Sequence, residues 1–241
     1  MIEFRNVSYT AEDGNEIIKD VSFKLDERFV VITGPNGSGK STIARLIAGI
    51  IKPTSGRIFL DGKDITDFTV TERATEGISY GFQQPVRFKG LTVKDLLSLA
   101  SGKKLTTAEA CTMLAKVGLC ARDYVGREAN ASLSGGELKR IEIATVLAKN
   151  SKLSVFDEPE AGIDLWSFQN LIKVFENMRK TINGTIIVIS HQERILNIAD
   201  EIVVIENGKV KAKGPKDEIL PGLLGTSAAA SIACEMLGGD Q

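Results

Sequence analysis

Residues 34–41 read Gly34-Pro35-Asn36-Gly37-Ser38-Gly39-Lys40-Ser41. This stretch fits the phosphate-loop pattern G-x-x-x-x-G-K-[ST] at every fixed position. Its glycines allow successive backbone N–H groups to point inward around the β- and γ-phosphates of a nucleotide, where a Cβ atom would obstruct the turn. Lys40 can supply a positive charge to the phosphates, and the Ser41 hydroxyl can ligate Mg²⁺. The stretch therefore predicts a site for a nucleoside triphosphate and its metal ion.

The residues on either side of the loop support this interpretation. The apolar run 29–32 is typical of a buried strand, and the residues from Thr42 to Ile50 are typical of a helix. Because the N-terminus of a helix is positive, Thr42 and the loop would face the phosphates together. A chance glycine-rich turn is the alternative, and the order strand, loop, helix argues against it.

The composition indicates one α/β domain with room for an inserted subdomain. The chain has 241 residues, of which 43% are apolar and 25% charged, enough to bury a full core. Its 30 Lys and Arg residues balance 31 Asp and Glu residues, so no net charge attracts nucleic acid or an anionic membrane. We therefore expect no nucleic-acid partner.

The apolar segments do not predict a membrane span. None approaches the roughly 20 uninterrupted residues that cross a bilayer, so we expect no direct membrane insertion. The chain begins with a strand pattern instead of a signal-peptide profile, and a cytoplasmic protein is expected. Residues 215–241 are expected to form a C-terminal tail that packs on the domain. The cysteines, Cys111, Cys120 and Cys234, have no metal-site spacing.

The order of strand and helix patterns predicts three parts within one domain, residues 1–241. Strands 2–9 and 17–25 precede the phosphate loop without a crossover helix, which indicates an antiparallel sheet beside a parallel core. The pattern is helical from about residue 84 to 150, which predicts a helical subdomain. Strand and helix patterns then alternate again from Leu153.

An acidic pair ends the strand that begins at Leu153. Val155 and Phe156 lead directly into Asp157 and Glu158. At the carboxyl end of a strand, Asp157 can hold Mg²⁺ through its water shell, and Glu158 can act as general base on the attacking water. Such a pair is a weak motif alone, and its place downstream of a phosphate loop strengthens it.

A second glycine motif lies upstream of that pair, where residues 133–137 read Leu133-Ser134-Gly135-Gly136-Glu137. These residues would form the N-terminus of a helix. There the Ser134 hydroxyl and the amides of Gly135 and Gly136 could contact phosphate. With the phosphate loop and the acidic pair, this motif resembles the signature sequence of the ATP-binding cassette (ABC) ATPases, and the similarity extends to about Gly214. The resemblance implies a P-loop NTPase fold of the α/β class, with a parallel core sheet, an antiparallel β-subdomain and an inserted helical subdomain, and Mg-dependent hydrolysis of ATP.

The resemblance also assigns roles to single residues. Gln83 matches the glutamine that contacts Mg²⁺ and the attacking water in the family. Asp164 matches the aspartate of the loop between subunits, and His191, the chain's only histidine, matches the histidine that senses the γ-phosphate. A homodimer that forms with ATP is also implied, in which Ser134 of one subunit caps the γ-phosphate held by Lys40 of the other.

One position departs from the family pattern. Where an aromatic ring commonly stacks on adenine, this chain has Ala11, and Tyr9 lies two residues earlier. The preference for adenine is therefore implied only by the family resemblance.

Two subfamilies remain as alternatives. Residues 76–78, 82–86, 136–143 and 191–196 are similar to SufC, the soluble cassette ATPase of iron–sulfur cluster assembly, and transporter cassettes usually have glutamines in place of the charged residues after Gly136. A SufC-like ATPase that acts on a SufB-type scaffold is the first interpretation. Pro159, however, is typical of transporters, so the alternative is the energy-coupling subunit of an ABC transporter with a transmembrane permease partner. A cassette acting on DNA or ribosomes fits poorly, because no tandem cassette, coiled-coil insertion or basic surface is evident.

Overall fold

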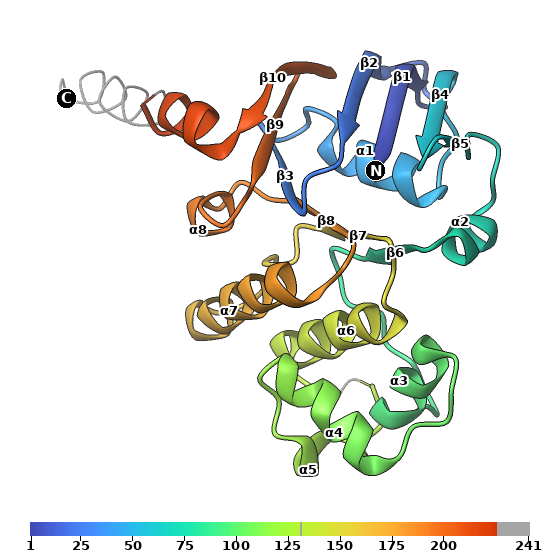
Figure 1. Ribbon diagram of the computed structural model, residues 1–241, viewed down its shortest axis with the longest axis vertical. Helices are drawn as coiled ribbons and strands as arrows, with labels where there is room; N and C mark the ends of the chain where they lie inside the picture. The colour runs from blue at the N-terminus through green and yellow to red at the C-terminus, as the bar shows by residue number, and fades with distance from the viewer. Residues whose placement is uncertain (131, 226–241) are drawn as a thin grey trace.

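The fold, seen in a computed structural model that describes residues 1–130 and 132–225, has two β-sheets above a block of helices (Figure 1). The smaller sheet is antiparallel and has the strand order β2-β1-β4-β5. Its strands are β1 (Ile2–Thr10), β2 (Glu16–Leu25), β4 (Ser55–Leu60) and β5 (Lys63–Asp64). Buried residues alternate with more exposed ones at the start of β1 and over the second half of β2, as expected for a sheet with one covered face, and shifts in register interrupt the pattern between them.

The larger sheet has the order β10-β9-β3-β8-β7-β6, in which only β10 is antiparallel to its neighbour. Its strands are β3 (Phe29–Thr33), β6 (Ile78–Gly81), β7 (Leu153–Asp157), β8 (Thr185–Ile189), β9 (Glu201–Glu206) and β10 (Lys209–Pro215). Every residue of β3, β7 and β8 is buried, because helices and the smaller sheet cover both faces of these central strands. Their carboxyl ends lie at one edge of the sheet, where ligands bind in open α/β sheets.

The helices fall into two groups. Those packed near the sheets are α1 (Lys40–Ala48), α2 (Val70–Glu76), α7 (Leu165–Thr181) and α8 (Glu193–Leu196). Those of the helical block are α3 (Val93–Ser101), α4 (Thr107–Lys116), α5 (Ala121–Tyr124) and α6 (Gly135–Lys149). Figure 1 shows α6 directly beneath β6 and β7, with α3, α4 and α5 farther from the sheets. The helix α6 is thus the element that joins the helical block to the sheet.

Local sequence explains where the block's helices begin. Thr92, Thr106 and Ser134 each accept a hydrogen bond from the backbone N–H three residues later, and an acidic side chain at that later position bonds back. These reciprocal capping boxes satisfy amide groups that a helix start leaves unpaired. Two apolar clusters then fill the protein: one lies between the sheets and α1, and the other joins α6 and α7 to the larger sheet.

The two sheets and the inserted helices confirm the predicted fold class. The sequence pattern did not reveal α2, β5, α5, α8 or β10. Of the expected tail, residues 216–225 are helical and Leu220 is buried, while residues 226–241, with Cys234, lie outside the described part of the chain. Among the described residues, no helix is long and apolar enough to span a bilayer.

Candidate functional site

The phosphate loop connects β3 to α1, and Lys40 is the first residue of that helix. Its Nζ donates to the carbonyl oxygens of Gly34 and Pro35, each at 2.8 Å. Burial lowers the pKa of Lys40, and the nearby carboxylates of Glu158 and Asp157 oppose this shift. The ammonium group therefore lies inside the loop, near the acidic pair.

The loop's glycines are required by space as well as by backbone angle. At Gly34, with φ +143°, a Cβ atom would lie 1.9 Å from the carbonyl oxygen of Ile205. At Gly39, with φ +101°, it would lie 2.6 Å from a methyl group of Ile18. The Ser38 hydroxyl is buried and has no hydrogen-bond partner among the described residues. A glycine-rich loop that holds one buried, unpaired hydroxyl fits a bound phosphate.

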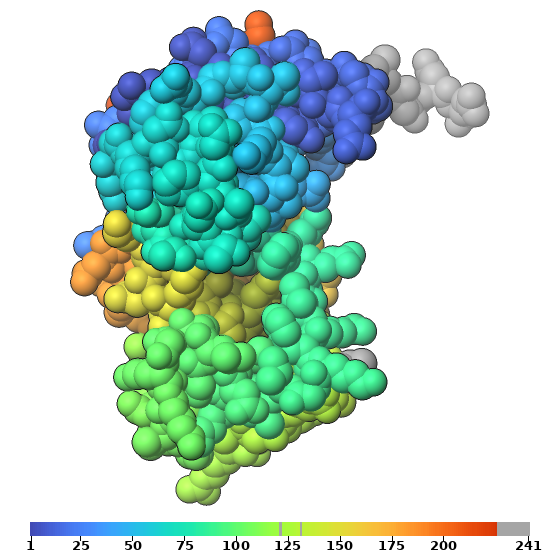
Figure 2. Space-filling view, turned by 90° about the vertical axis from the view of Figure 1, so that its right-hand side faces the viewer, coloured from blue at the N-terminus to red at the C-terminus, as the bar shows by residue number. Residues whose placement is uncertain are grey.

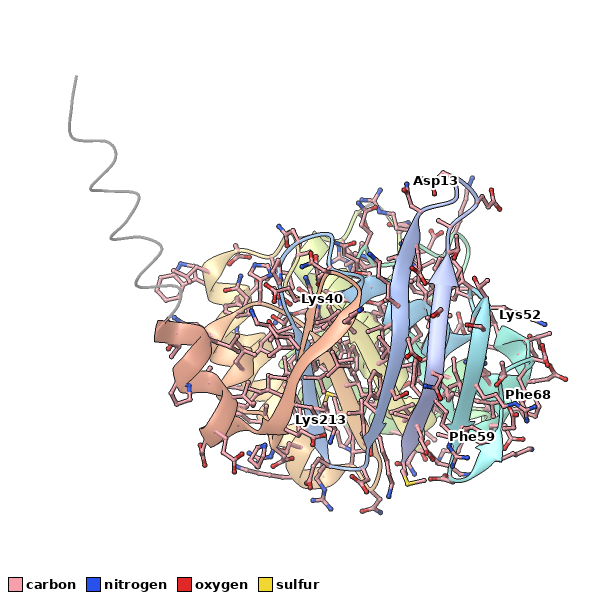
Figure 3. All side chains as sticks on the ribbon, turned by 90° about the horizontal axis from the view of Figure 1, so that it is seen from above. Asp13, Lys40, Lys52, Phe59, Phe68 and Lys213 are labelled. Atoms are coloured by element: carbon pink, nitrogen blue, oxygen red, sulfur yellow. The ribbon has the colours of Figure 1, made fainter. Side chains whose placement is uncertain are left out.

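The remaining loop residues lie where a nucleotide could reach them. Pro35, Asn36 and Gly37 are exposed, and Ser41 and Thr42 are half-buried in the first turn of α1. In the view from above, Lys40 lies within the molecule, while Asp13 marks the outer tip of the hairpin between β1 and β2 (Figure 3). Ala11 belongs to that same hairpin connection.

Asp157 is held from two sides at the end of β7. Its Oδ1 accepts a hydrogen bond from the Ser41 hydroxyl at 2.8 Å, and its Oδ2 accepts one from the Tyr80 hydroxyl at 2.9 Å. Only 2% of Asp157 is exposed. Burial and the Asp157 carboxylate raise the pKa of Tyr80, against the opposing effect of Arg45, so the phenol remains a donor. Ser41 and Asp157 together form an oxygen-rich pair suited to Mg²⁺.

Glu158 follows Asp157 and lies opposite Gln83. The Gln83 Nε2 donates to the Glu158 Oε2 at 2.6 Å. Glu158 has φ +43°, a left-handed conformation that is uncommon outside glycine and that is often found at functional sites. The fold therefore brings the carboxylate that follows β7 and the amide that follows β6 into direct contact.

His191 is exposed on the loop after β8, and it lines the same hollow as Gly34 and Pro35. The residue before it, Ser190, is fully buried and its hydroxyl donates to the Glu160 carboxylate. The backbone N–H of Gln192 donates to the Ser190 hydroxyl at 3.0 Å. Burial raises the pKa of Glu160, and the Ser190 hydrogen bond opposes the shift. Glu160 thus holds the loop that carries His191, through its contact with the Ser190 hydroxyl.

The signature residues lie elsewhere. Ser134 and Gly135 are exposed at the start of α6, and a Cβ atom on Gly136 would approach the Ser167 hydroxyl of α7 to 3.1 Å. Asp164 caps α7 by accepting from the backbone N–H groups of Trp166 and Ser167, each at 3.0 Å. Within the described residues, no hydrogen bond joins these groups to the phosphate loop. One chain therefore assembles the loop, the acidic pair and Gln83, and leaves the signature residues apart.

Two contributors to the site were not predicted from the sequence. Tyr80 reaches Asp157 from a neighbouring strand, and Lys139 reaches the backbone of Phe82 and Gln83 from α6. A tyrosine in an apolar strand gives no sign of its partner. For Lys139 the sequence did offer a signal, because a charged residue in a helix that packs on a sheet needs a polar partner.

Comparison with known proteins identifies the family. The family model described as ABC transporter matches residues 18–161. An uncharacterized ABC transporter ATP-binding protein of Methanocaldococcus jannaschii is 38% identical over 213 residues, which are 85% of each chain. The energy-coupling factor transporter ATP-binding protein EcfA1 of Mycoplasma mobile is 32% identical, over 91% of this chain and 82% of its own.

A solved structure gives the same answer for the fold. A dimeric ATP-binding cassette bound to ADP and inorganic phosphate after hydrolysis aligns with a TM-score of 0.78 and 25% identity, over 90% of this chain and 99% of that one. The family match covers more than half of this chain, and the phosphate loop, Asp157 and Glu158 all lie within it. The chain belongs to the ABC transporter family, as an ATP-binding cassette that binds and hydrolyses ATP.

Proposed function

We propose that this cassette is the ATP-hydrolysing subunit of a membrane transporter, coupled to a separate transmembrane permease. The relatives named as transporter ATP-binding proteins, among them the energy-coupling factor subunit EcfA1, favour this assignment over the iron–sulfur one. It was the alternative interpretation of the sequence and becomes the first here. A cytoplasmic location stays a prediction.

Hydrolysis in this proposal uses the residues that the fold brings together. The loop amides and Lys40 hold the β- and γ-phosphates of ATP, with Ser38 as a further donor. Ser41 and Asp157 are the residues that would hold Mg²⁺, Asp157 through a water molecule. Bound Mg²⁺ would neutralise charge that develops on the phosphates during transfer.

Glu158 is the proposed general base. Its carboxylate follows the end of β7 near Lys40, and Gln83 holds it through the 2.6 Å hydrogen bond. Gln83 would also contact Mg²⁺ and orient the attacking water, while His191 would sense the γ-phosphate from the opposite loop. Proton transfer from water to Glu158 produces the nucleophile that attacks the γ-phosphorus and releases ADP.

A second copy of the chain would complete the site. Because Ser134, Gly135 and Gly136 lie apart from the phosphate loop of their own chain, we propose that they cap the γ-phosphate bound by a partner copy. Asp164 would lie at the contact between copies. Loss of the γ-phosphate removes the bridging contact, so the dimer is expected to open after hydrolysis.

An apolar groove beside Gln83 is the proposed docking site for the permease. Large apolar side chains are exposed there: Val70 by 50%, Phe82 by 43%, Val86 by 41% and Phe88 by 41%. Two adjoining hollows share Phe82 in their walls: α2 and α6 line one, and residues 80–88 and the helical block line the other. Figure 2 shows the depression between the α2 region and the green helical block. A partner seated on Phe82 would touch the residue next to Gln83.

A soluble scaffold of the SufB type is the second candidate partner. The charged residues Glu137, Lys139 and Arg140 after the signature glycines favour it, since they stand where transporter cassettes usually have glutamines. The two candidates differ in the partner and share the chemistry of ATP hydrolysis.

Affinity capture from a detergent-solubilised native extract distinguishes the two partners. We expect a polytopic membrane protein to co-purify, and a soluble scaffold in its place would support the second candidate. Val86→Asp and Phe88→Asp should abolish capture and leave basal hydrolysis intact. Leu99→Asp, which changes a leucine 68% exposed on α3, is the matched control and should retain the partner.

Two variants test the chemistry independently of any partner. Lys40→Ala should abolish nucleotide binding, whereas Glu158→Gln should bind ATP and hydrolyse it about 10²–10⁴-fold more slowly. With ATP and Mg²⁺, the Glu158→Gln protein should sediment as a dimer. Equal loss of binding in both variants would refute the general-base role, and a Glu158→Gln protein that stays monomeric with its partner present would refute the two-copy site.

A further inference from the structure

An ion pair lies buried where α6, the signature helix that Ser134 caps, meets the larger sheet. Lys139 and Glu142 are one helical turn apart on α6, and the Lys139 Nζ lies 2.9 Å from the Glu142 Oε2. Their side chains are only 2% and 13% exposed. Burial raises the pKa of Glu142, against the opposing effect of Lys139, which indicates the cost of placing this charge here. Such pairs often add little to stability compared with apolar side chains of the same volume.

The pair holds both backbone polar groups of one residue, Phe82, directly after β6. The backbone N–H of Phe82 donates to the Glu142 Oε1 at 2.9 Å, and the Phe82 carbonyl oxygen accepts from the Lys139 Nζ. The same ammonium donates to the Gln83 carbonyl oxygen at 3.3 Å. These contacts fasten the backbone of the two residues that follow β6 to side chains of α6.

The contacts continue from Gln83 to the proposed general base. The Gln83 backbone is fixed to α6 through Lys139, and its side-chain amide bonds to Glu158 at 2.6 Å. The same helix is capped by the signature residue Ser134, five residues before Lys139. A short helix segment therefore connects the signature residue to Gln83.

We propose that Lys139 and Glu142 are positioning residues that fasten Gln83 to the signature helix, so that movement of α6 moves the Gln83 amide relative to Glu158. The inference rests on the roles proposed above for Gln83 and Glu158. When Ser134 engages the nucleotide of a second copy, the shift of α6 then reaches the hydrolytic site of its own chain. The pair thereby couples the two ATP sites of a dimer.

A purely structural role is the alternative, and α6 offers a matched control. Lys149, near the end of the same helix, is partly buried and its Nζ donates to the Ile78 carbonyl oxygen at 3.0 Å. Lys149 thus also ties α6 to a backbone carbonyl, but at the first residue of β6 and not at the residues that follow the strand, where Gln83 lies. Loss of either lysine should loosen α6 from β6, and only loss of Lys139 should release Gln83.

The test compares Lys139→Met, the double variant Lys139→Met/Glu142→Leu, and Lys149→Met in the full chain. Lys139→Met leaves the Glu142 carboxylate buried without its partner and should lower stability, whereas the double variant removes both charges and should recover it. We expect both to lower kcat for ATP about 10- to 100-fold, with KM within about threefold, because a catalytic group is misplaced and ATP binding is retained. Lys149→Met should keep kcat within about twofold of the parent.

Cooperativity provides a readout that stability does not move. If the parent hydrolyses ATP with a Hill coefficient above one, both Lys139 variants should bring it to about one, and Lys149→Met should leave it unchanged. Recovery of parental kcat in the stable double variant would overturn the proposal, as would an equal loss in Lys149→Met. Glu158→Gln is run alongside: if that variant hydrolyses ATP normally, the site assignment itself fails, whereas an inactive Glu158→Gln with fully active Lys139 variants refutes only the coupling.

Discussion

Replacing Tyr80 with phenylalanine tests how Asp157, the carboxylate proposed to hold Mg²⁺, is positioned. The change removes the hydroxyl that donates to the Asp157 Oδ2 at 2.9 Å and leaves the ring, which packs edge-on against Phe82, in place. Asp157 keeps only the Ser41 hydroxyl on its other oxygen. Since Asp157 is 2% exposed, solvent cannot readily replace the lost donor.

The size of the effect follows from the charge of the acceptor. A hydrogen bond to a charged group contributes about 1.5–3 kcal/mol. For a chain of this length, each kcal/mol shifts the melting temperature by about 2–4 °C, so Tyr80→Phe should lower it by about 3–12 °C. The carboxylate would also lose its fixed orientation, and changes of this kind typically weaken metal binding by about 10- to 100-fold.

The assay is ATP hydrolysis as a function of Mg²⁺ concentration, together with a melting curve for each protein. We expect the half-saturating Mg²⁺ concentration to rise by about 10- to 100-fold, and kcat to recover when Mg²⁺ saturates. Tyr124→Phe is the control, because the Tyr124 hydroxyl also donates to a carboxylate, that of Glu137 at 2.5 Å, but in the helical block. A melting temperature that falls in Tyr80→Phe without any change in Mg²⁺ dependence would show that Tyr80 supports the fold alone.

Three further outcomes are expected. Ala11→Tyr should tighten ATP binding about tenfold and GTP binding less, because it supplies a ring for base stacking, and an unchanged affinity by calorimetry would place the base elsewhere. Arg73→Met should lower the free energy of unfolding by about 3 kcal/mol or more in urea titrations, with an unchanged KM, because the fully buried guanidinium donates to the carbonyl oxygens of Ile47 and Thr66. Burial raises the pKa of Glu160 above 4.5, so its contribution to stability is complete below that pH and is lost as the pH rises through the raised value. Glu160→Gln should therefore be less sensitive to pH in that window, and urea midpoints that follow the parent at each pH would contradict this.

Much of the candidate site could be predicted from contiguous residues. The phosphate loop, the acidic pair and the signature glycines are local patterns whose chemistry depends on neighbours in the chain, and the fold places Lys40, Ser41 and Asp157 close together. The preference for SufC was drawn from short charged stretches, and the relatives named as transporter proteins favour the other assignment. Such stretches show similarity over a few residues only, whereas the partner is selected by an exposed surface that several helices and strands form together.

The sequence alone determined that this chain has a phosphate loop between a buried strand and a helix, because each part requires only glycine geometry and local periodicity. Tertiary structure decided which distant side chains hold that site. Tyr80 reaches Asp157 because β6 and β7 pair in parallel, with Tyr80 opposite Val155. Lys139 reaches Gln83 because α6 packs beneath those strands. These contacts join residues 56 to 77 positions apart, and only the packing of one element against another can set their distances.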